Sequence, residues 1–229
     1  TRQSEDTPVR TPETENLLIN LKKVSARGFM FGHHDDTNYG IGWEGDEGRS
    51  DVKSVCGDYP AVISFDLGHI ELGDTMSLDK VPFTKIRKEI LNQCKRGGMS
   101  SLSWHLRNPL TGGDSWDVSD TTVVKSILPG ANHEKFTGWV SKVSAFINSL
   151  QTEEGVKVPV LFRPWHEHTG SWFWWGEKLC TPEEYKALWH MTVDILRNDG
   201  VDNALYAYSP GSEPQDTCLL YTSDAADER

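Results

Sequence analysis

The stretch that decides the fold is residues 158–176, VPVLFRPWHEHTGSWFWWG. Its first five residues form an apolar run of strand length, and charged, polar and aromatic residues follow it directly. An apolar run without alternation indicates a strand buried on both faces, as the strands of a parallel sheet are. The stretch therefore predicts a buried parallel strand with functional side chains gathered just after its carboxyl end.

The same arrangement recurs along the chain. Apolar runs predict strands at residues 28–32, 61–65, 99–104, 158–162 and 204–208. HHDD follows the first of them, DLGHIE the second and HLRNP the third. Polar residues at the carboxyl ends of parallel strands are typical of a (β/α)8 barrel. The predicted fold is therefore α/β, an incomplete (β/α)8 TIM barrel with about five βα units.

Segments of helical period lie between the predicted strands. Thr11 before Pro12 is expected to cap one helix, and Thr181-Pro182-Glu183-Glu184 reads as a capping box that begins another. Two further apolar stripes predict buried helix faces, at Phe83, Ile86, Ile90 and Cys94, and at Phe136, Trp139, Val140, Val143, Ile147 and Leu150. The alternation of strands and helices supports a parallel α/β domain.

Composition excludes several classes of function. The chain of 229 residues carries 23 basic and 34 acidic residues, a net charge of −11. An acidic surface argues against a nucleic-acid partner, and no apolar run approaches the ~20 residues of a membrane span. No GxGxxG directly follows the first predicted strand, and no Walker lysine motif occurs. The four cysteines form no CxxC pair, so we expect buried, unpaired thiols.

The two ends of the chain are expected to stand apart from the domain. Residues 1–11 are polar and predict a flexible lead-in without a signal segment. Residues 218–229, CLLYTSDAADER, resemble the translation of a transposase-type sequencing adapter. We therefore expect an artefactual tail there, natural sequence to near Thr217, and a partial catalytic domain over residues 12–217.

Glu167 is the leading candidate for acid–base chemistry, because it follows a buried strand among aromatic rings. Apolar surroundings disfavour the charged form of a carboxyl group, which suits a general acid. His166 and Arg163 could orient or polarise its neighbours, and the alternative is a structural ion pair between Glu167 and Arg163. A zincin motif fails on spacing, because HExxH would need histidine at Gly170.

A metal cluster is a weaker alternative. It would combine the residues of HHDD, His33, His34, Asp35 and Asp36, with His166 or His168. Consecutive residues rarely point at one ion, so we expect no metal and no cofactor.

Tryptophan is unusually frequent, with nine residues in the chain. Seven lie at or after predicted strand ends: Trp43, Trp104, Trp116, Trp165, Trp172, Trp174 and Trp175. A rim of indole rings suits sugars, whose C–H faces stack on aromatic rings. We expect some of the seven, first of all Trp174 and Trp175, only to fill the top of the barrel.

Together FGHHDDTNYGIGW, SLSWHLRNP, GGDSWD, RPWHEHTGSWFWWG and YSP resemble glycoside hydrolase family 26, chiefly β-mannanases, over roughly residues 12–214. The resemblance implies a (β/α)8 barrel that hydrolyses β-1,4-mannosidic bonds with retention of configuration. It implies that Glu167 is the acid/base, that His166 orients the catalytic carboxylates, and that His105 lies near the sugar at the cleaved bond. Trp116 and Trp172 match aromatic substrate contacts. Further substrate-binding candidates are Arg163, Asp66, His34 and Trp165.

The resemblance also implies a nucleophile, a glutamate at the end of strand seven, that no residue here matches. Glu213 follows the fifth predicted strand, and Glu228 lies in the adapter-like tail. We therefore expect this chain to be inactive and poorly stable, and its parent to be an endo-acting, monomeric mannanase on mannan, glucomannan or galactomannan. Because polymeric mannan cannot enter a cell, the parent is expected to be secreted, periplasmic or attached to the cell surface.

Four alternatives remain open. Within the same family, the enzyme could be a β-1,3-xylanase or a mixed-linkage β-glucanase. Outside it, the chain could be a non-catalytic carbohydrate-binding protein, or a metal-dependent hydrolase that uses His33, His34 and Asp35.

Overall fold

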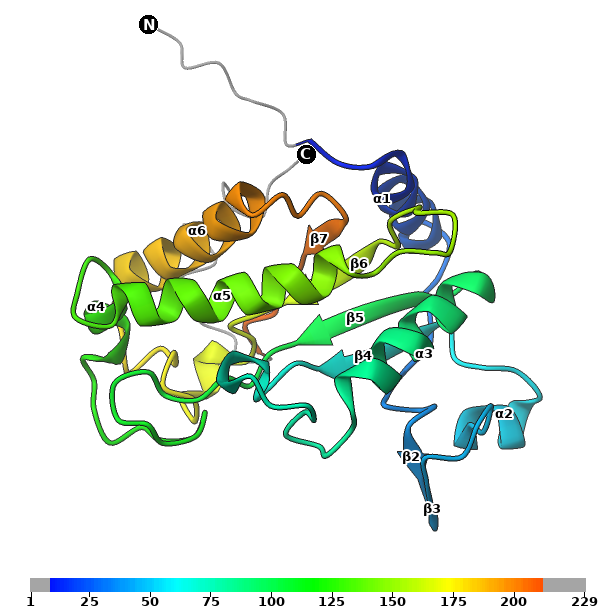
Figure 1. Ribbon diagram of the computed structural model, residues 1–229, viewed down its shortest axis with the longest axis horizontal. Coiled ribbons are helices and arrows are strands. Elements are labelled where there is room, and N and C mark those ends of the chain that lie inside the picture. The colour runs from blue at the N-terminus through cyan, green and yellow to red at the C-terminus, as the bar shows by residue number, and fades with distance from the viewer. Residues whose placement is uncertain (1–8, 212–229) are drawn as a thin grey trace, which may run out of the picture.

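The computed structural model describes residues 9–211, so Glu213, Glu228, most of the predicted lead-in and the adapter-like tail lie outside the described residues. A five-stranded sheet in the order β1-β4-β5-β6-β7 forms the centre of the described chain (Figure 1). Every neighbouring pair of these strands is parallel. Strands adjacent in this sheet follow one another along the chain, as they do in a barrel, and the predicted fold class of an incomplete (β/α)8 barrel is confirmed.

The strands of this sheet are β1 (Gly32–His34), β4 (Val62–Asp66), β5 (Met99–Ser103), β6 (Val160–Arg163) and β7 (Ala204–Tyr206). A separate antiparallel pair consists of β2 (Tyr39–Gly40) and β3 (Trp43–Glu44). The α-helices are α1 (Pro12–Ser25), α2 (Asp51–Cys56), α3 (Phe83–Lys95), α4 (Val123–Ile127), α5 (His133–Asn148) and α6 (Pro182–Asn198). Two 3-10 turns are η1 (Ile70–Leu72) and η2 (His168–Gly170).

The core lies between the sheet and the helices along its outer side, where Figure 1 shows α3, α5 and α6. The predicted stripe of α5 is buried over its whole length, with Phe136, Val140 and Ile147 fully enclosed. Helix α6 begins with the predicted capping box of Thr181 and Glu184. Thr11 caps α1, and its side chain accepts a hydrogen bond from the backbone N–H of Thr14.

The first predicted strand is wrong in its position and burial. The strand begins at Gly32 rather than at residue 28, and Phe29 and Phe31 are 88% and 57% exposed. Within residues 9–211, β1 pairs only with β4, so it lies at an edge of the sheet. The run GFMFG therefore lacks the second neighbour that would bury it.

The predicted burial of the cysteines is also wrong. Cys56 and Cys94 are exposed free thiols, and Cys180 is half-buried. On α3 the buried face continues from Ile86 and Ile90 to Gln93 rather than to Cys94. The side chain of Gln93 donates a hydrogen bond to the carbonyl oxygen of Pro60 at 2.8 Å, which holds it inward.

Among the described residues, no helix is both long enough and apolar enough to cross a bilayer.

Candidate active site

A cavity of about 490 Å³ runs along the inner side of β1, β4, β5 and β6 to the residues after β6. Its lining consists of Gly32, His33, His34, Val62, Ser64, Ser101, Ser103, His105, Arg163, His166 and Glu167. Five of the predicted site residues thus meet in one cavity: His34, His105, Arg163, His166 and Glu167. Of the described residues that line it, Glu167 is the one carboxylate.

Glu167 is held in a left-handed backbone conformation, with φ at 56°. Its backbone N–H donates to the carbonyl oxygen of Ser209 at 2.8 Å, which ties it to the segment after β7. Its Oε2 accepts a hydrogen bond from Trp172 Nε1 at 3.2 Å. The side chain is 44% exposed, so the apolar enclosure predicted for it is not formed by the described residues. The carboxyl group is therefore accessible to a ligand in the cavity.

Arg163 lies beside Glu167, as the ion-pair alternative predicted, but the contact is long. Nη2 of Arg163 is 4.0 Å from Oε1 of Glu167. The shorter contact of Arg163 is made by its Nε, which donates to Ser209 Oγ at 2.7 Å. Ser209 thus holds both the guanidinium and the backbone of Glu167. The sequence did not predict this role, although Ser209 belongs to the motif YSP.

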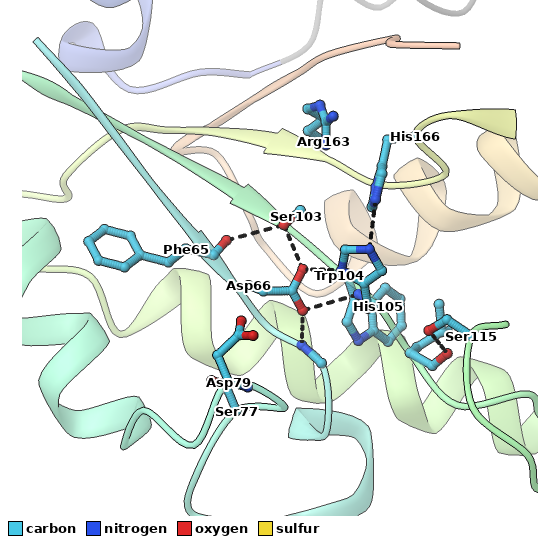
Figure 2. Close-up of polar contacts among 12 residues, drawn as sticks. Phe65, Asp66, Ser77, Asp79, Ser103, Trp104, His105, Ser115, Arg163 and His166 are labelled. Atoms are coloured by element: carbon cyan, nitrogen blue, oxygen red, sulfur yellow. Dashed lines mark hydrogen bonds and ion pairs between the residues drawn. The ribbon is translucent and has the colours of Figure 1, made fainter. Parts of the chain in front are cut away.

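A hydrogen-bonded chain of three side chains runs from the cavity wall to the buried Asp66 (Figure 2). Nδ1 of His105 is 2.6 Å from Oδ2 of Asp66, and Nε2 of His105 is 3.0 Å from Nε2 of His166. Ser103 Oγ also donates to Oδ2 of Asp66, at 2.5 Å. The other oxygen, Oδ1, accepts from the backbone N–H groups of Gly68 and His105. Sequence reasoning missed Ser103, whose place on a predicted strand gave no chemical signal.

The charge states along this chain follow from burial and hydrogen bonding. Burial opposes ionisation of Asp66, but the hydrogen bond and charge of His105, with further donors from Ser103 and Gly68, outweigh it and lower the pKa of Asp66 to about 2. Burial, followed by the charges of His105 and Arg163, lowers the pKa of His166 to about 3. At neutral pH Asp66 is therefore ionised and His166 is neutral.

Two predicted substrate contacts are not available to a ligand in this structure. Asp66 is 2% exposed, and both its oxygens are occupied by donors from the protein. Trp165 has no exposed surface and donates from Nε1 to Thr192 Oγ1. Asp66 therefore supports His105 rather than a sugar, and Trp165 belongs to the core.

The exposed tryptophans flank the cavity. Trp116 is 48% exposed and stacks on the ring of His105, with centroids 5.3 Å apart and planes at 8°. Trp172 is 47% exposed and bonds to Glu167. Four other predicted rim residues are buried: Trp43, Trp104, Trp174 and Trp175. Trp116 and Trp172 thus offer flat apolar surfaces on which a sugar ring could stack.

His34 belongs to a group that could hold a cation. Its ligand atom and those of Asp35 and Asp79 lie within 4.8 Å of one another. Burial disfavours the charged ring, but hydrogen bonds and charges from Asp35 and Asp79 prevail and raise the pKa of His34 to about 10. A protonated nitrogen cannot ligate a metal ion. At neutral pH a proton therefore competes strongly with a metal ion for the ring nitrogen of His34. The group contains Asp79, which sequence reasoning missed, instead of His166 or His168.

Comparison with known proteins identifies a family for this chain. The sequence model of glycosyl hydrolase family 26 matches residues 7–225. A mannan endo-1,4-beta-mannosidase of Bifidobacterium adolescentis is 36% identical over 208 residues, covering 88% of this chain and 20% of that protein. A mannan endo-1,4-beta-mannosidase of Bacillus subtilis is 29% identical over 69% of this chain and 46% of its own length.

Solved structures show the same relationship. A β-mannanase from Bacteroides ovatus is 62% identical with a TM-score of 0.90, over 95% of this chain and 63% of that one. An endo-β-1,4-mannanase from Cellulomonas fimi is 33% identical with a TM-score of 0.84, over 96% of this chain and 50% of that one. This chain thus spans less than two thirds of each of these four relatives. On the match of sequence and fold together, it belongs to glycosyl hydrolase family 26.

Proposed function

We propose that this chain supplies the acid/base half of a retaining endo-β-1,4-mannanase that acts on mannan, glucomannan or galactomannan. One observation carries the proposal: the carboxyl group of Glu167 is accessible in a cavity beside His166, at hydrogen-bond distance from the exposed indole of Trp172. Relatives named as mannanases support the choice of substrate.

In the proposed first step, Glu167 donates its proton to the glycosidic oxygen while a second carboxylate attacks the anomeric carbon. The bond between that carbon and the leaving oxygen breaks, and a covalent glycosyl–enzyme forms. In the second step, Glu167 removes a proton from water, whose oxygen displaces the carboxylate. Trp116 and Trp172 would stack on sugar rings to either side.

We propose that the second carboxylate is a glutamate outside these 229 residues. A retaining enzyme needs its two carboxyl groups about 5–5.5 Å apart. Glu167 is the one carboxylate among the described residues that line the cavity, and Asp66 already accepts four hydrogen bonds from the protein. This chain alone would then hydrolyse nothing. We further propose that the whole enzyme is a monomer outside the cytoplasm, where polymeric mannan is found.

The test compares this chain with the full-length protein encoded by its gene. We expect the full-length protein to release reducing ends from galactomannan and glucomannan, and the chain of 229 residues to release none. Release by the short chain that is abolished by Glu167→Ala would refute its inactivity. A faster rate on β-1,3-xylan or mixed-linkage β-glucan would assign a different substrate, and binding without turnover would make the protein a lectin. Inhibition by chelators would support the metal-dependent alternative.

The role of Glu167 is tested in the full-length protein by Glu167→Gln. General acid catalysis contributes about 10²–10⁴-fold, so the rate on mannan should fall by at least that factor. The bond-breaking step should fall much less for an aryl mannoside with a dinitrophenolate leaving group, which needs no protonation. Glu134→Gln, at an exposed carboxylate in the first turn of α5, is the matched control and should act as the unchanged protein does. Equal losses on both substrates would exclude Glu167 as the acid.

A further inference from the structure

We propose that Asp66 is a positioning residue that sets the proton positions of two cavity histidines in series. The proposal concerns the chain Asp66–His105–His166 in Figure 2, where His105 lies between the other two side chains. Its functional meaning rests on the proposed function, but its proton positions can be measured without any catalytic activity.

The first step of the argument is the orientation of the carboxylate. Oδ1 of Asp66 accepts from two backbone N–H groups, those of Gly68 at 2.7 Å and His105 at 3.2 Å. These donors cannot change their role, so they fix Oδ1 as an acceptor. Oδ2 then faces Ser103 Oγ at 2.5 Å and His105 Nδ1 at 2.6 Å. Because the carboxylate is ionised and only accepts, Nδ1 of His105 must carry a proton.

The second step of the argument concerns the proton position on His166. When His105 is neutral, its proton on Nδ1 leaves a lone pair on Nε2. Nε2 of His166 lies 3.0 Å away and must then be the donor, because two lone pairs cannot bond. Neutral His166 therefore has its proton on Nε2 and a lone pair on Nδ1. Nδ1 is buried and makes no hydrogen bond of ordinary geometry among the described residues.

The arrangement has two consequences for the cavity. It holds the plane of the His105 ring, on which the exposed ring of Trp116 stacks. It also leaves His166 neutral next to Glu167 in the cavity wall. A positive ring there would favour the ionised form of a neighbouring carboxyl group, whereas a general acid must hold a proton. Asp66 would thus act on the reaction through His105 and His166, without touching the sugar.

Asp66→Asn makes the sharpest test, because the backbone donors at Oδ1 dictate how the amide must lie. The amide oxygen has to remain at Oδ1, so the NH2 group takes the place of Oδ2. That group donates to Nδ1 of His105, which therefore loses its proton and carries it on Nε2 instead. His105 then donates to His166, whose proton must move to Nδ1. We expect both histidines to switch tautomer together.

The measurement is the imidazole 15N chemical shifts of the 229-residue chain, from long-range 1H–15N correlation, with the rings assigned by His105→Gln and His166→Gln. In the unchanged chain we expect protons on Nδ1 of His105 and Nε2 of His166, and in Asp66→Asn the reverse on both. Ser103→Ala is the matched control. It removes one donor from Oδ2 but leaves the carboxylate, so both tautomers should stay as in the unchanged chain.

The unchanged chain alone can overturn the proposal, even if Asp66→Asn fails to fold. Protons on both nitrogens of His105, or a proton on Nδ1 of His166, would show that Asp66 charges the first ring instead of setting its tautomer. A switch of tautomers in Ser103→Ala would also contradict it. In the full-length protein, Asp66→Asn should lower kcat about 10–100-fold with little change in KM, as loss of an outer partner of a functional histidine does. If the tautomers behave as expected but the full-length protein cleaves no mannan, the proposed function fails and the positioning role stands.

Discussion

At the scale of single residues, Gly170 decides where the exposed ring of Trp172 can lie. A Cβ atom at position 170 would overlap the six-membered ring of Trp172. Because that ring is 47% exposed, it can swing into solvent, and its hydrogen bond to Glu167 would then break. Glycine at residue 170 therefore leaves room for the indole of Trp172 to lie beside Glu167, the proposed acid.

We accordingly expect Gly170→Ala in the full-length protein to weaken binding of manno-oligosaccharides and to lower kcat, while the unfolding free energy changes by less than about 1 kcal/mol. Calorimetric titration and thermal unfolding measure the two effects separately. Gly138→Ala is the control, because position 138 lies in α5 with nothing within 4 Å of the added atom. It should stabilise the helix by up to about 1 kcal/mol and leave binding unchanged. Unchanged binding and kcat in Gly170→Ala would contradict the assigned role.

His34 links stability to pH. Its pKa of about 10 in the folded chain exceeds the ordinary value of 6.5, because of Asp35 and Asp79. The folded chain therefore holds its proton more tightly than the unfolded chain. This contribution is complete below pH 6.5 and disappears as pH rises through 10. The side chain is 43% exposed, so solvent screening makes the effect smaller than the pKa alone implies.

We expect the unfolding free energy to fall between these two pH values, and the fall to be shallower in His34→Asn. Urea denaturation at a series of pH values measures it. The nearby phenol of Tyr39 does not confuse the result, because burial and the charges of Asp35 and Asp79 raise its pKa to about 12. Equal slopes in both proteins would show that His34 is not held in the charged form.

Four of the predicted site residues that line the cavity share one feature: His105, Arg163, His166 and Glu167 lie in motifs at strand ends. The position of Trp165 in the core could not be predicted from its place after a strand end. Both Trp165 and Glu167 have left-handed backbones, with φ of 54° and 56°. Such turns break the alternation of a strand, so sequence spacing no longer says which side chain faces the cavity. The burial of Asp66, expected to contact substrate, could not be predicted either, because its partner His105 lies far away in sequence.

At the scale of elements, the first turn of α6 supports the site from behind. Thr181 and Glu184 satisfy each other's backbone N–H groups in a capping box. In that turn, the hydroxyl group of Tyr185 donates to the carbonyl oxygen of Trp165 at 2.7 Å. Trp165 directly precedes His166 in the cavity wall. The first turn of α6 therefore helps to hold the backbone of the cavity wall in place.

We expect Thr181→Ala to lower the unfolding free energy by about 1 kcal/mol, because one helix N–H loses its acceptor. Chemical denaturation followed by circular dichroism measures this. Thr181→Ser keeps the side-chain oxygen and should recover most of the loss. If both variants are equally destabilised, the missing methyl group and not the cap accounts for the effect.

The strand boundaries show where the hydrophobic pattern of the sequence predicts strands and where it does not. Four of the five predicted strands appear within two residues of their expected starts. The exception is the first predicted strand: β1 begins only at Gly32, and the apolar residues Phe29 and Phe31 before it are exposed. The two-residue strands β2 and β3 are too short to leave any pattern.

At the scale of the whole molecule, the described sheet has two unpaired edges, β1 and β7. A closed barrel pairs such edges with each other or with further strands. Next to β1 lies an apolar groove of about 530 Å³, lined by Phe31, Asp51, Val52, Val55, Cys56, Tyr59, Pro60 and Ala61. Phe31 and Val55 are 57% and 88% exposed in it. Unpaired strand edges beside exposed apolar side chains favour association between chains.

We therefore expect the 229-residue chain to self-associate as its concentration rises, in contrast to the monomer proposed for the full-length enzyme. Sedimentation velocity across a range of concentrations measures this. The double variant Phe31→Lys, Val55→Lys places charge in the groove beside the β1 edge and should shift the chain toward monomer. Lysine at the exposed Val118, which lies outside the groove, is the control and should change nothing. Association that persists unchanged in the double variant would place the contact elsewhere, with the edge of β7 as the next surface to alter.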